Sequence, residues 1–378
     1  MTEGARRATG LVQPSALLLT RRGVLTGVAS LAVATTARAQ GFAGLGRDAA
    51  GFATVTPDRV WAFPADHGAH TDFRIEWWYV TANLKDATGD DYGVQWTLFR
   101  QAMAPATADA RENDGGWASR HIWMGHAAVT RADSHRYAET FSRGGIGTAG
   151  VTASPLNAWI DAWQLKAGDG FDATTVSPIT ISASGADFDY ALTLRASQPL
   201  VLQGDRGTSK KSERGQASYY YSQPFYEAAG RVTIDGKDVD VTGTAWLDRE
   251  WSSQPLASDQ TGWDWFSLHL GDGDKLMLFR LRQTGGANYF SGNWIGRNGV
   301  STQLPSDAIT MSALATTKIG ARDIPTSWRV GVPSRGLRID VTPLNPQSWM
   351  GTSFPYWEGP IRFSGSHSGM GYLEMTGY

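Results

Sequence analysis

Hydrophobic and polar residues alternate along most of the chain. In DFRIEWWYVTANL, residues 72–84, this alternation is combined with two adjacent tryptophans, Trp77 and Trp78. Because a strand points successive side chains to opposite faces, one indole must lie on each side of a sheet. The same alternation predicts strands within residues 91–102, 231–241 and 265–282.

Turn signals separate these segments. Residues 87–91, ATGDD, predict a hairpin turn, and Asp235-Gly236 is the strongest short hairpin signal in the chain. Gly271 to Asp274 predict a third turn. No segment keeps a helical period over a long stretch, although short helices around 102–110 or 307–313 are alternatives. Many short strands joined by glycine-rich turns indicate an all-β sandwich or barrel protein.

The strands fall into two sets. One runs from about Pro57 to Ser222 and the other from about Gln223 to the C-terminus. The polar stretch 204–218 lies just before the junction and is predicted to be a mobile loop. We therefore expect domains at 40–222 and 223–378, in agreement with a chain length that suggests two domains.

The N-terminus is typical of an export signal. Thr20 to Gly27, TRRGVLTG, open a short apolar run, and Ala37-Arg38-Ala39 resembles a cleavage site. The run is shorter than the roughly 20 residues that a membrane span needs. Residues 1–39 are thus predicted to be a twin-arginine signal peptide, and the mature protein is expected to be soluble and periplasmic.

Composition narrows the possible functions. The chain contains no cysteine, which excludes disulfides, thiolate metal sites and a cysteine nucleophile. A formal charge of −2 without blocks of one sign argues against nucleic-acid binding. The 44 glycines and 16 tryptophans favour a β-rich protein with aromatic-lined interiors. No dinucleotide, Walker or G-x-S-x-G motif occurs, so we expect no cofactor.

Landmark motifs across the chain resemble those of the AttH/CrtC family. They are FPADHGAHTDFRIEWWYVTANL at 63–84, GHAAVT at 125–130, YYYSQP at 219–224, GTAWLDREW at 243–251, YWEGP at 356–360 and GYLEMTGY at 371–378. The resemblance implies two tandem lipocalin-like antiparallel β-barrel domains packed together. The family includes proteins named after an ABC-transporter operon component, carotenoid 1,2-hydratases and fungal relatives reported to cyclise polyketides. Fold alone does not choose among these functions.

Four residues are candidates for catalysis. Glu76 is either an acid in an apolar cavity or half of a structural Glu–Arg pair. His126 lies on an apolar strand face, where a hydrogen-bonded core histidine is the alternative. Asp248 and Asp264 are candidate acids beside tryptophans, and their alternatives are an ion-pair network between the barrels and a carboxylate satisfied by backbone amides.

Alternation also predicts that Asp248 and Glu250 share one strand face and that Arg249 and Trp251 share the other. As we interpret the family, its carotenoid hydratases have His and Asn where this chain has Arg249 and Glu250. This departure weakens the transfer of hydratase activity.

The candidates for ligand binding are aromatic residues and one arginine. We expect the walls of a cavity to include Trp77, Trp78, Tyr79, Tyr220, Arg249, Trp251, Trp263, Trp265 and Trp357. The stretch around Trp357 is first interpreted as a closing strand. His67 and His70 with Asp66 and Asp72 suggest a metal site, but they come from one loop without a partner cluster, and we expect no metal there.

Two functions remain open. The first is a carrier that binds a lipid, polyene or similar hydrophobic molecule, with an ABC transporter as a candidate partner. The alternative is an enzyme that adds water to an isolated C=C bond, in which a protonated carboxyl is the acid. An enzyme should have one candidate acid inside a cavity and more than a ring's width from any Arg or Lys. A carrier should have its acids paired or at the seam between the barrels, and purely apolar cavity walls.

Overall fold

The computed structural model describes residues 45, 49–106 and 119–378. Its first thirteen strands are β1 (Ile75–Asp86), β2 (Asp91–Ala102), β3 (His121–Thr130), β4 (His135–Ser142), β5 (Ala149–Ala153), β6 (Leu156–Ile160), β7 (Trp163–Asp172), β8 (Ser177–Ser184), β9 (Phe188–Arg195), β10 (Val201–Leu202), β11 (Thr208–Lys210), β12 (Ala217–Ile234) and β13 (Lys237–Ser252). The predicted signal peptide, residues 1–39, lies outside the described residues.

Ten further strands follow. They are β14 (Gln260–Leu270), β15 (Lys275–Gln283), β16 (Tyr289–Ile295), β17 (Ser301–Leu304), β18 (Thr310–Ile319), β19 (Arg322–Val332), β20 (Leu337–Pro343), β21 (Trp349–Met350), β22 (Tyr356–Gly365) and β23 (Gly369–Thr376). The helical elements described are short 3₁₀ turns, η2 (Ala65–His67), η3 (Ser306–Ala308) and η4 (Pro333–Arg335).

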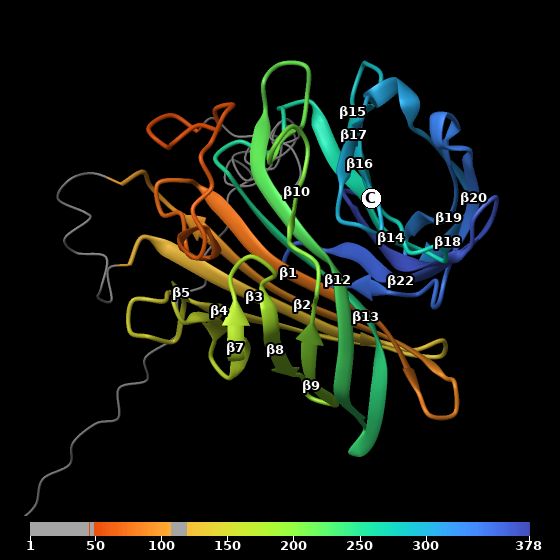
Figure 1. Ribbon diagram of the computed structural model, residues 1–378, viewed down its shortest axis with the longest axis horizontal. Coiled ribbons are helices and arrows are strands. Elements are labelled where there is room, and N and C mark those ends of the chain that lie inside the picture. The colour runs from red at the N-terminus through yellow and green to blue at the C-terminus, as the bar shows by residue number, and fades with distance from the viewer. Residues whose placement is uncertain (1–44, 46–48, 107–118) are drawn as a thin grey trace, which may run out of the picture. The chain divides into compact units, whose positions relative to one another are not determined.

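The strands form two antiparallel sheets, which confirms the predicted all-β class with two lipocalin-like barrels. The first sheet has the order β4-β3-β2-β1-β13-β12-β9-β8-β7-β6-β5, with β10 and β11 also paired to β12. The second has the order β17-β16-β15-β14-β23-β22-β20-β19-β18, with β21 paired to β22. Figure 1 shows the second sheet, in cyan and blue, curling into a ring.

The predicted turns are confirmed. Strand β1 ends at Asp86 and β2 begins at Asp91, and the Asp86 carboxylate accepts hydrogen bonds from the backbone N–H groups of Thr88 (2.9 Å) and Asp90 (3.0 Å). Between β12 and β13, Asp235 and Gly236 have φ angles of 52° and 74°. These left-handed angles are those of the tight turn whose twist matches paired strands.

Other boundaries differ from the expectation. Strands β12 and β13 belong to the first sheet, so the change of sheet falls between Ser252 and Gln260 and not at residues 222 and 223. The reason is strand pairing. Strand β13 pairs with both β1 and β12, so it links the first strand of the sheet to strands from the middle of the chain. Within 204–218, β11 pairs with β12. The alternative of a short helix near 307–313 is met only by the 3₁₀ turn η3 at its start, because β18 begins at Thr310.

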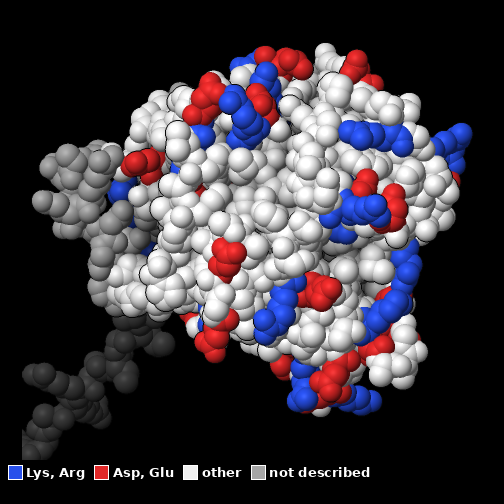
Figure 2. All heavy atoms as spheres, in the orientation of Figure 1, with Lys and Arg blue, Asp and Glu red and all other residues white. Residues whose placement is uncertain are grey.

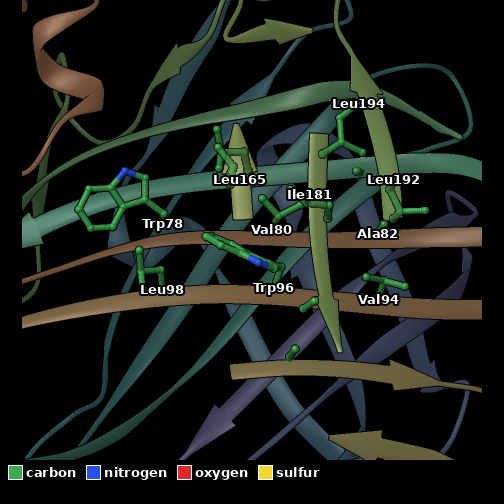
Figure 3. Close-up of a cluster of buried hydrophobic side chains, with 14 of the residues drawn as sticks. Trp78, Val80, Ala82, Val94, Trp96, Leu98, Leu165, Ile181, Leu192 and Leu194 are labelled. Carbon is green, nitrogen blue, oxygen red and sulfur yellow. The ribbon is translucent and has the colours of Figure 1, made fainter. Parts of the chain in front are cut away.

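Alternation along the strands separates three large hydrophobic clusters and a small fourth one, which contains Tyr356. One fills the first barrel and includes Trp78 and Trp96, which lie among aliphatic side chains in Figure 3. A second fills the other barrel around Phe266 and Trp328. The third contains residues from both sheets, such as Tyr79 and Trp265, so it forms the seam between the barrels.

The two faces of β1 explain the adjacent tryptophans. Trp78 points into the first barrel and is 2% exposed, whereas Trp77 packs against the seam cluster. The prediction that the two indoles lie on opposite faces of a sheet is therefore confirmed.

The outer surface is mixed in charge. On the face shown in Figure 2, basic and acidic side chains lie near one another around a largely uncharged centre. None of the helices in the described part of the chain has the length and hydropathy that a membrane span requires.

Candidate functional site

The seam between the barrels contains a cleft with a cavity volume of about 170 Å³. Apolar side chains from both sheets form most of its wall: Ile75, Phe99, Ile122 and Met124 from the first, and Phe279, Leu281 and Phe354 from the second half of the chain. Its aromatic lining includes Trp77, Tyr79, Tyr220, Trp263 and Trp265, all predicted to bind a ligand. The cleft is thus an apolar site to which both barrels contribute.

Asp248 lines this cleft from β13. It is 3% exposed, and its carboxyl accepts hydrogen bonds from the Tyr220 hydroxyl (2.5 Å), the Ser222 hydroxyl (2.5 Å) and Trp246 Nε1 (2.6 Å). Burial raises the pKa of Asp248 to about 7, against the lowering effect of these three donors. A large share of the carboxyl is therefore still protonated at neutral pH, and no Arg or Lys is among these partners.

Glu250 lies two residues further along β13 and lines the same cleft. It accepts a hydrogen bond from Ser218 and pairs with Lys211 Nζ at 2.7 Å, with both side chains less than a tenth exposed. The Lys211 ammonium also lies 4.4 Å from the centre of the Phe279 ring. The predicted shared face of Asp248 and Glu250 is confirmed, and only the second of these acids is paired with a cation.

Two further carboxyl groups come from the second sheet. Glu374 lines the cleft, and burial raises its pKa to about 7. Glu358 lies directly opposite Glu374 on β22 and accepts a hydrogen bond from the Tyr79 hydroxyl at 2.5 Å. Burial and the nearby Glu374 raise the pKa of Glu358 well above its usual range. Sequence reasoning treated both as parts of closing strands, and the acidic residues in YWEGP and GYLEMTGY were the available signal.

His126 lines the cleft on β3, on the face with Ile122 and Met124 as predicted. Its Nδ1 lies 2.9 Å from the Tyr356 hydroxyl and its Nε2 lies 3.0 Å from the Glu139 carboxylate. Burial lowers the pKa of His126, so the imidazole is neutral. Tyr356, which sequence reasoning did not single out as a site residue, also lines the cleft.

Glu76 lies in the first barrel and is fully buried. Its carboxylate pairs with Arg100 and, at 2.6 Å, with Arg249. Although burial opposes ionisation, these two guanidinium groups hold the pKa of Glu76 well below its usual value. This geometry corresponds to the structural alternative, a buried Glu–Arg cluster.

Arg249 belongs to this cluster, and Trp78 and Trp251 pack against it. None of these three residues lines the cleft. The guanidinium carbon of Arg249 lies 3.6 Å from the centre of the Trp78 ring and 5.1 Å from that of Trp251. The predicted pairing of Arg249 with Trp251 on one face is confirmed. Their role as ligand contacts stays a prediction, and it would require access to the interior of the first barrel.

Asp264 and Trp357 lie in the second barrel, apart from the cleft. Asp264 pairs with Arg280 and Arg282, each at 2.7 Å, and accepts a hydrogen bond from the Tyr378 hydroxyl at 2.7 Å. Trp357 is fully buried in the core and donates to the Pro346 carbonyl at 2.9 Å. Neither residue is brought near Asp248 and His126 at the cleft wall.

The histidines of the loop before β1 have protein partners. His67 lies between the Tyr221 hydroxyl (2.7 Å) and the Ala173 carbonyl (2.9 Å), and burial lowers its pKa to about 4. His70 stacks on Trp251 with ring centres 3.8 Å apart. Among the described residues, no group of three or more His, Asp and Glu side chains is arranged to hold a metal ion.

Comparisons with known proteins agree with this architecture. The chain resembles an AttH protein of Nitrosomonas europaea with 32% identity and a TM-score of 0.76, over 86% of this chain and 99% of the other. It also resembles kievitone hydratase of Nectria haematococca with 14% identity and a TM-score of 0.63, over 86% and 96% of the two chains. No curated protein matches the chain. The AttH-like family model matches residues 54–378, and the chain therefore belongs to the AttH-like family.

Proposed function

We propose that this protein binds a hydrophobic small molecule in the cleft between its two barrels. The observation that carries the proposal is the composition of the cleft wall, where apolar side chains from both sheets surround the cavity and polar groups are few. Sites of this kind bind ligands through buried apolar area, and their few polar groups determine orientation. The expected ligand is an extended lipid or polyene.

A neutral fluorophore provides the test. N-phenylnaphthylamine should bind to the full chain with an increase in fluorescence, and Ile122→Trp should weaken binding at least tenfold because the larger side chain fills the cleft. Leu314→Trp is the matched control, since Leu314 is 46% exposed on β18. Equal binding by both variants would reject the cleft as the site.

Carrier function would include exchange of the ligand with a membrane transporter. Its support is the twin-arginine pattern at Thr20 to Gly27, which is expected to direct the protein to the compartment where such transporters collect their ligands. Organic extraction of the protein purified from its native cells, followed by mass spectrometry, should recover an unmodified hydrophobic compound. A protein without any extractable ligand would contradict this function.

A second candidate is an enzyme that adds water to a C=C bond, and Asp248 is the observation that favours it. This acid lines the cavity, as expected for an enzyme, and its hydrogen-bond partners are Tyr220, Ser222 and Trp246. Its place at the seam is also the one expected for the acids of a carrier, so activity must decide between the two. The carboxyl would protonate one alkene carbon and leave a carbocation on the other. Water would then add to the cation and return its proton to the carboxylate, so that the acid is regenerated.

Asp248→Asn separates the two candidates. An enzyme should convert the extracted compound to a product heavier by one water, and the variant should lose this activity by at least a hundredfold while it still binds the compound. Asp240→Asn is the control, because Asp240 lies on the same strand with its side chain 84% exposed. Full conversion by Asp248→Asn would exclude Asp248 as the acid.

A further inference from the structure

One row of side chains crosses the first sheet beneath the cleft. The strand register places side by side, in this order, Glu139, His126, Thr97, Tyr79, Asp248 and Ser222. Directly opposed residues of antiparallel strands share one face of the sheet. Since neighbouring strands lie about 4.8 Å apart, His126 and Asp248 are separated by roughly 14 Å across three strand intervals.

Polar groups lie at both ends of this row and line the same cavity. At one end are Asp248 and Tyr220, and at the other are His126 and Tyr356. Between them lies Tyr79, whose hydroxyl donates to Glu358 at 2.5 Å. The middle of the row therefore offers a ring with an occupied hydroxyl. At the Asp248 end the Tyr220 hydroxyl also has partners, since it donates to Asp248 and accepts from Trp265 Nε1 at 3.2 Å, and the Asp248 carboxyl is the group at that end of the cleft that a ligand would meet.

The hydrogen bonds at the His126 end have a defined direction. The Glu139 carboxylate accepts from Nε2, so the neutral imidazole accepts at Nδ1 from the Tyr356 hydroxyl. Glu139 is itself held by the backbone N–H and the hydroxyl of Ser353, at 3.0 Å and 2.9 Å. The Tyr356 oxygen is also approached by Gln95 Nε2 at a long 3.4 Å, and the Tyr356 side chain shares a hydrogen bond with Glu358, so a ligand would take the remaining acceptor position of the hydroxyl.

We propose that the cleft selects elongated hydrophobic molecules with a polar group at each end. Asp248 with Tyr220 binds one polar group, and the Tyr356 hydroxyl binds the other. His126 and Glu139 are positioning residues, because they hold the direction of the Tyr356 hydroxyl. This inference rests on the proposed binding function of the cleft and adds the class of ligand.

A matched pair of probes tests the selection. Dodecanol and the dodecanediol with a hydroxyl at each end have the same chain length, and both are titrated against the full chain by calorimetry. The diol should bind about tenfold more tightly, because its second hydroxyl forms an additional buried hydrogen bond. Tyr356→Phe and Asp248→Leu should each reduce this ratio to about twofold or less, because neither new side chain can form a hydrogen bond to the second hydroxyl.

Tyr226→Phe is the control for loss of a buried hydroxyl. Tyr226 donates to the Val176 carbonyl inside the first barrel at 2.6 Å, so its variant should keep the wild-type ratio. If the wild type binds the two probes equally, the inference is overturned and the binding function stands. If neither probe binds, the proposed function itself fails.

Glu139 provides a second test that does not depend on folding of Tyr356→Phe. Glu139→Ala should lose the preference for the diol, and Glu139→Gln should recover most of it because the amide oxygen can still accept from Nε2. Nitrogen NMR of the wild type should show His126 protonated at Nε2 and not at Nδ1. The opposite tautomer, or an undiminished preference in Glu139→Ala, would overturn the positioning role.

Discussion

Asp248 makes folding stability depend on pH. Its pKa of about 7 exceeds the ordinary value of 3.8, so the native state holds the proton more tightly than the unfolded chain. The resulting stability is complete below pH 4 and is lost as the pH rises to 7. At about 1.4 kcal/mol per pKa unit, the loss is of order 4 kcal/mol. Urea unfolding at pH 5 and pH 8 should show a smaller decrease in Asp248→Asn than in the wild type.

A comparison of the wild type with Asp248→Asn measures the contribution of the Asp248 carboxyl to the pH dependence of stability. Glu374 has a similarly raised pKa, whereas His67, with its pKa lowered to about 4, gains stability over the same range of rising pH. The His67 contribution is common to both proteins and cancels in the difference. Asp248 is one cause of the raised Glu374 pKa, so part of the Glu374 contribution is lost together with Asp248 in the variant. Asp240→Asn, at an exposed position of β13, should follow the wild type. If the free energy of unfolding fell by the same amount from pH 5 to pH 8 in Asp248→Asn as in the wild type, Asp248 would already be ionised in the native protein at pH 5.

Glu76 stabilises the first barrel as a buried anion between Arg100 and Arg249. In Glu76→Gln both guanidinium groups lose their counter-charge inside the core, and we expect a loss of about 3–5 kcal/mol in the free energy of unfolding. Asp340→Asn breaks a surface pair with Arg329 and should cost less than about 1 kcal/mol. Equal losses in the two variants, measured by urea unfolding, would contradict the structural role of Glu76.

Strand β1 places its two adjacent indoles in different environments. Trp78 lies in the core of the first barrel, so Trp78→Ala should cost about 3–5 kcal/mol of stability. Trp77 lines the cleft and is partly exposed, so Trp77→Ala should cost clearly less but weaken fluorophore binding. The measurements are urea unfolding and fluorescence titration. The reverse order of stability losses would mean that the faces of β1 are exchanged.

Alternation and turn signals involve residues close together in the sequence, so the structural features that they determine could be predicted. The faces of β1, the placement of Asp248 with Glu250, and the turn at Asp235-Gly236 follow from residues close in sequence. The partners of these residues could not be predicted in the same way. Arg100 reaches Glu76 only through the register of β1 with β2, which a single sequence does not specify.

At the scale of the whole molecule, the seam between the barrels was the least predictable feature. Glu358 and Tyr356 lie at the start of β22, far along the chain from Tyr79 and His126, which they contact. Such contacts depend on how two sheets pack, and the pattern within one strand carries no information on this packing. The resemblance to a family implied two barrels, but it did not indicate that the proposed binding site lies between them.

The seam also couples the stability of the two barrels. Gly93 on β2 faces Pro360 of the second sheet so closely that a Cβ atom would lie 2.5 Å from Pro360 Cγ. Gly93→Ala should therefore force the sheets apart and cost about 1–3 kcal/mol. Scanning calorimetry should show one transition in the wild type, because the barrels share a hydrophobic cluster, and a lower or divided transition in the variant.

Gly168→Ala is the matched control for this substitution. Its Cβ atom would also meet a proline, Pro178, but at 3.2 Å and within the first sheet. The seam would be untouched, so the transition should stay single and close to that of the wild type. If Gly93→Ala also kept the wild-type transition, the close approach of Gly93 to Pro360 would not hold in solution. The cleft could then not depend on a fixed spacing between the barrels, and the selection of ligands with a polar group at each end would lose its structural basis.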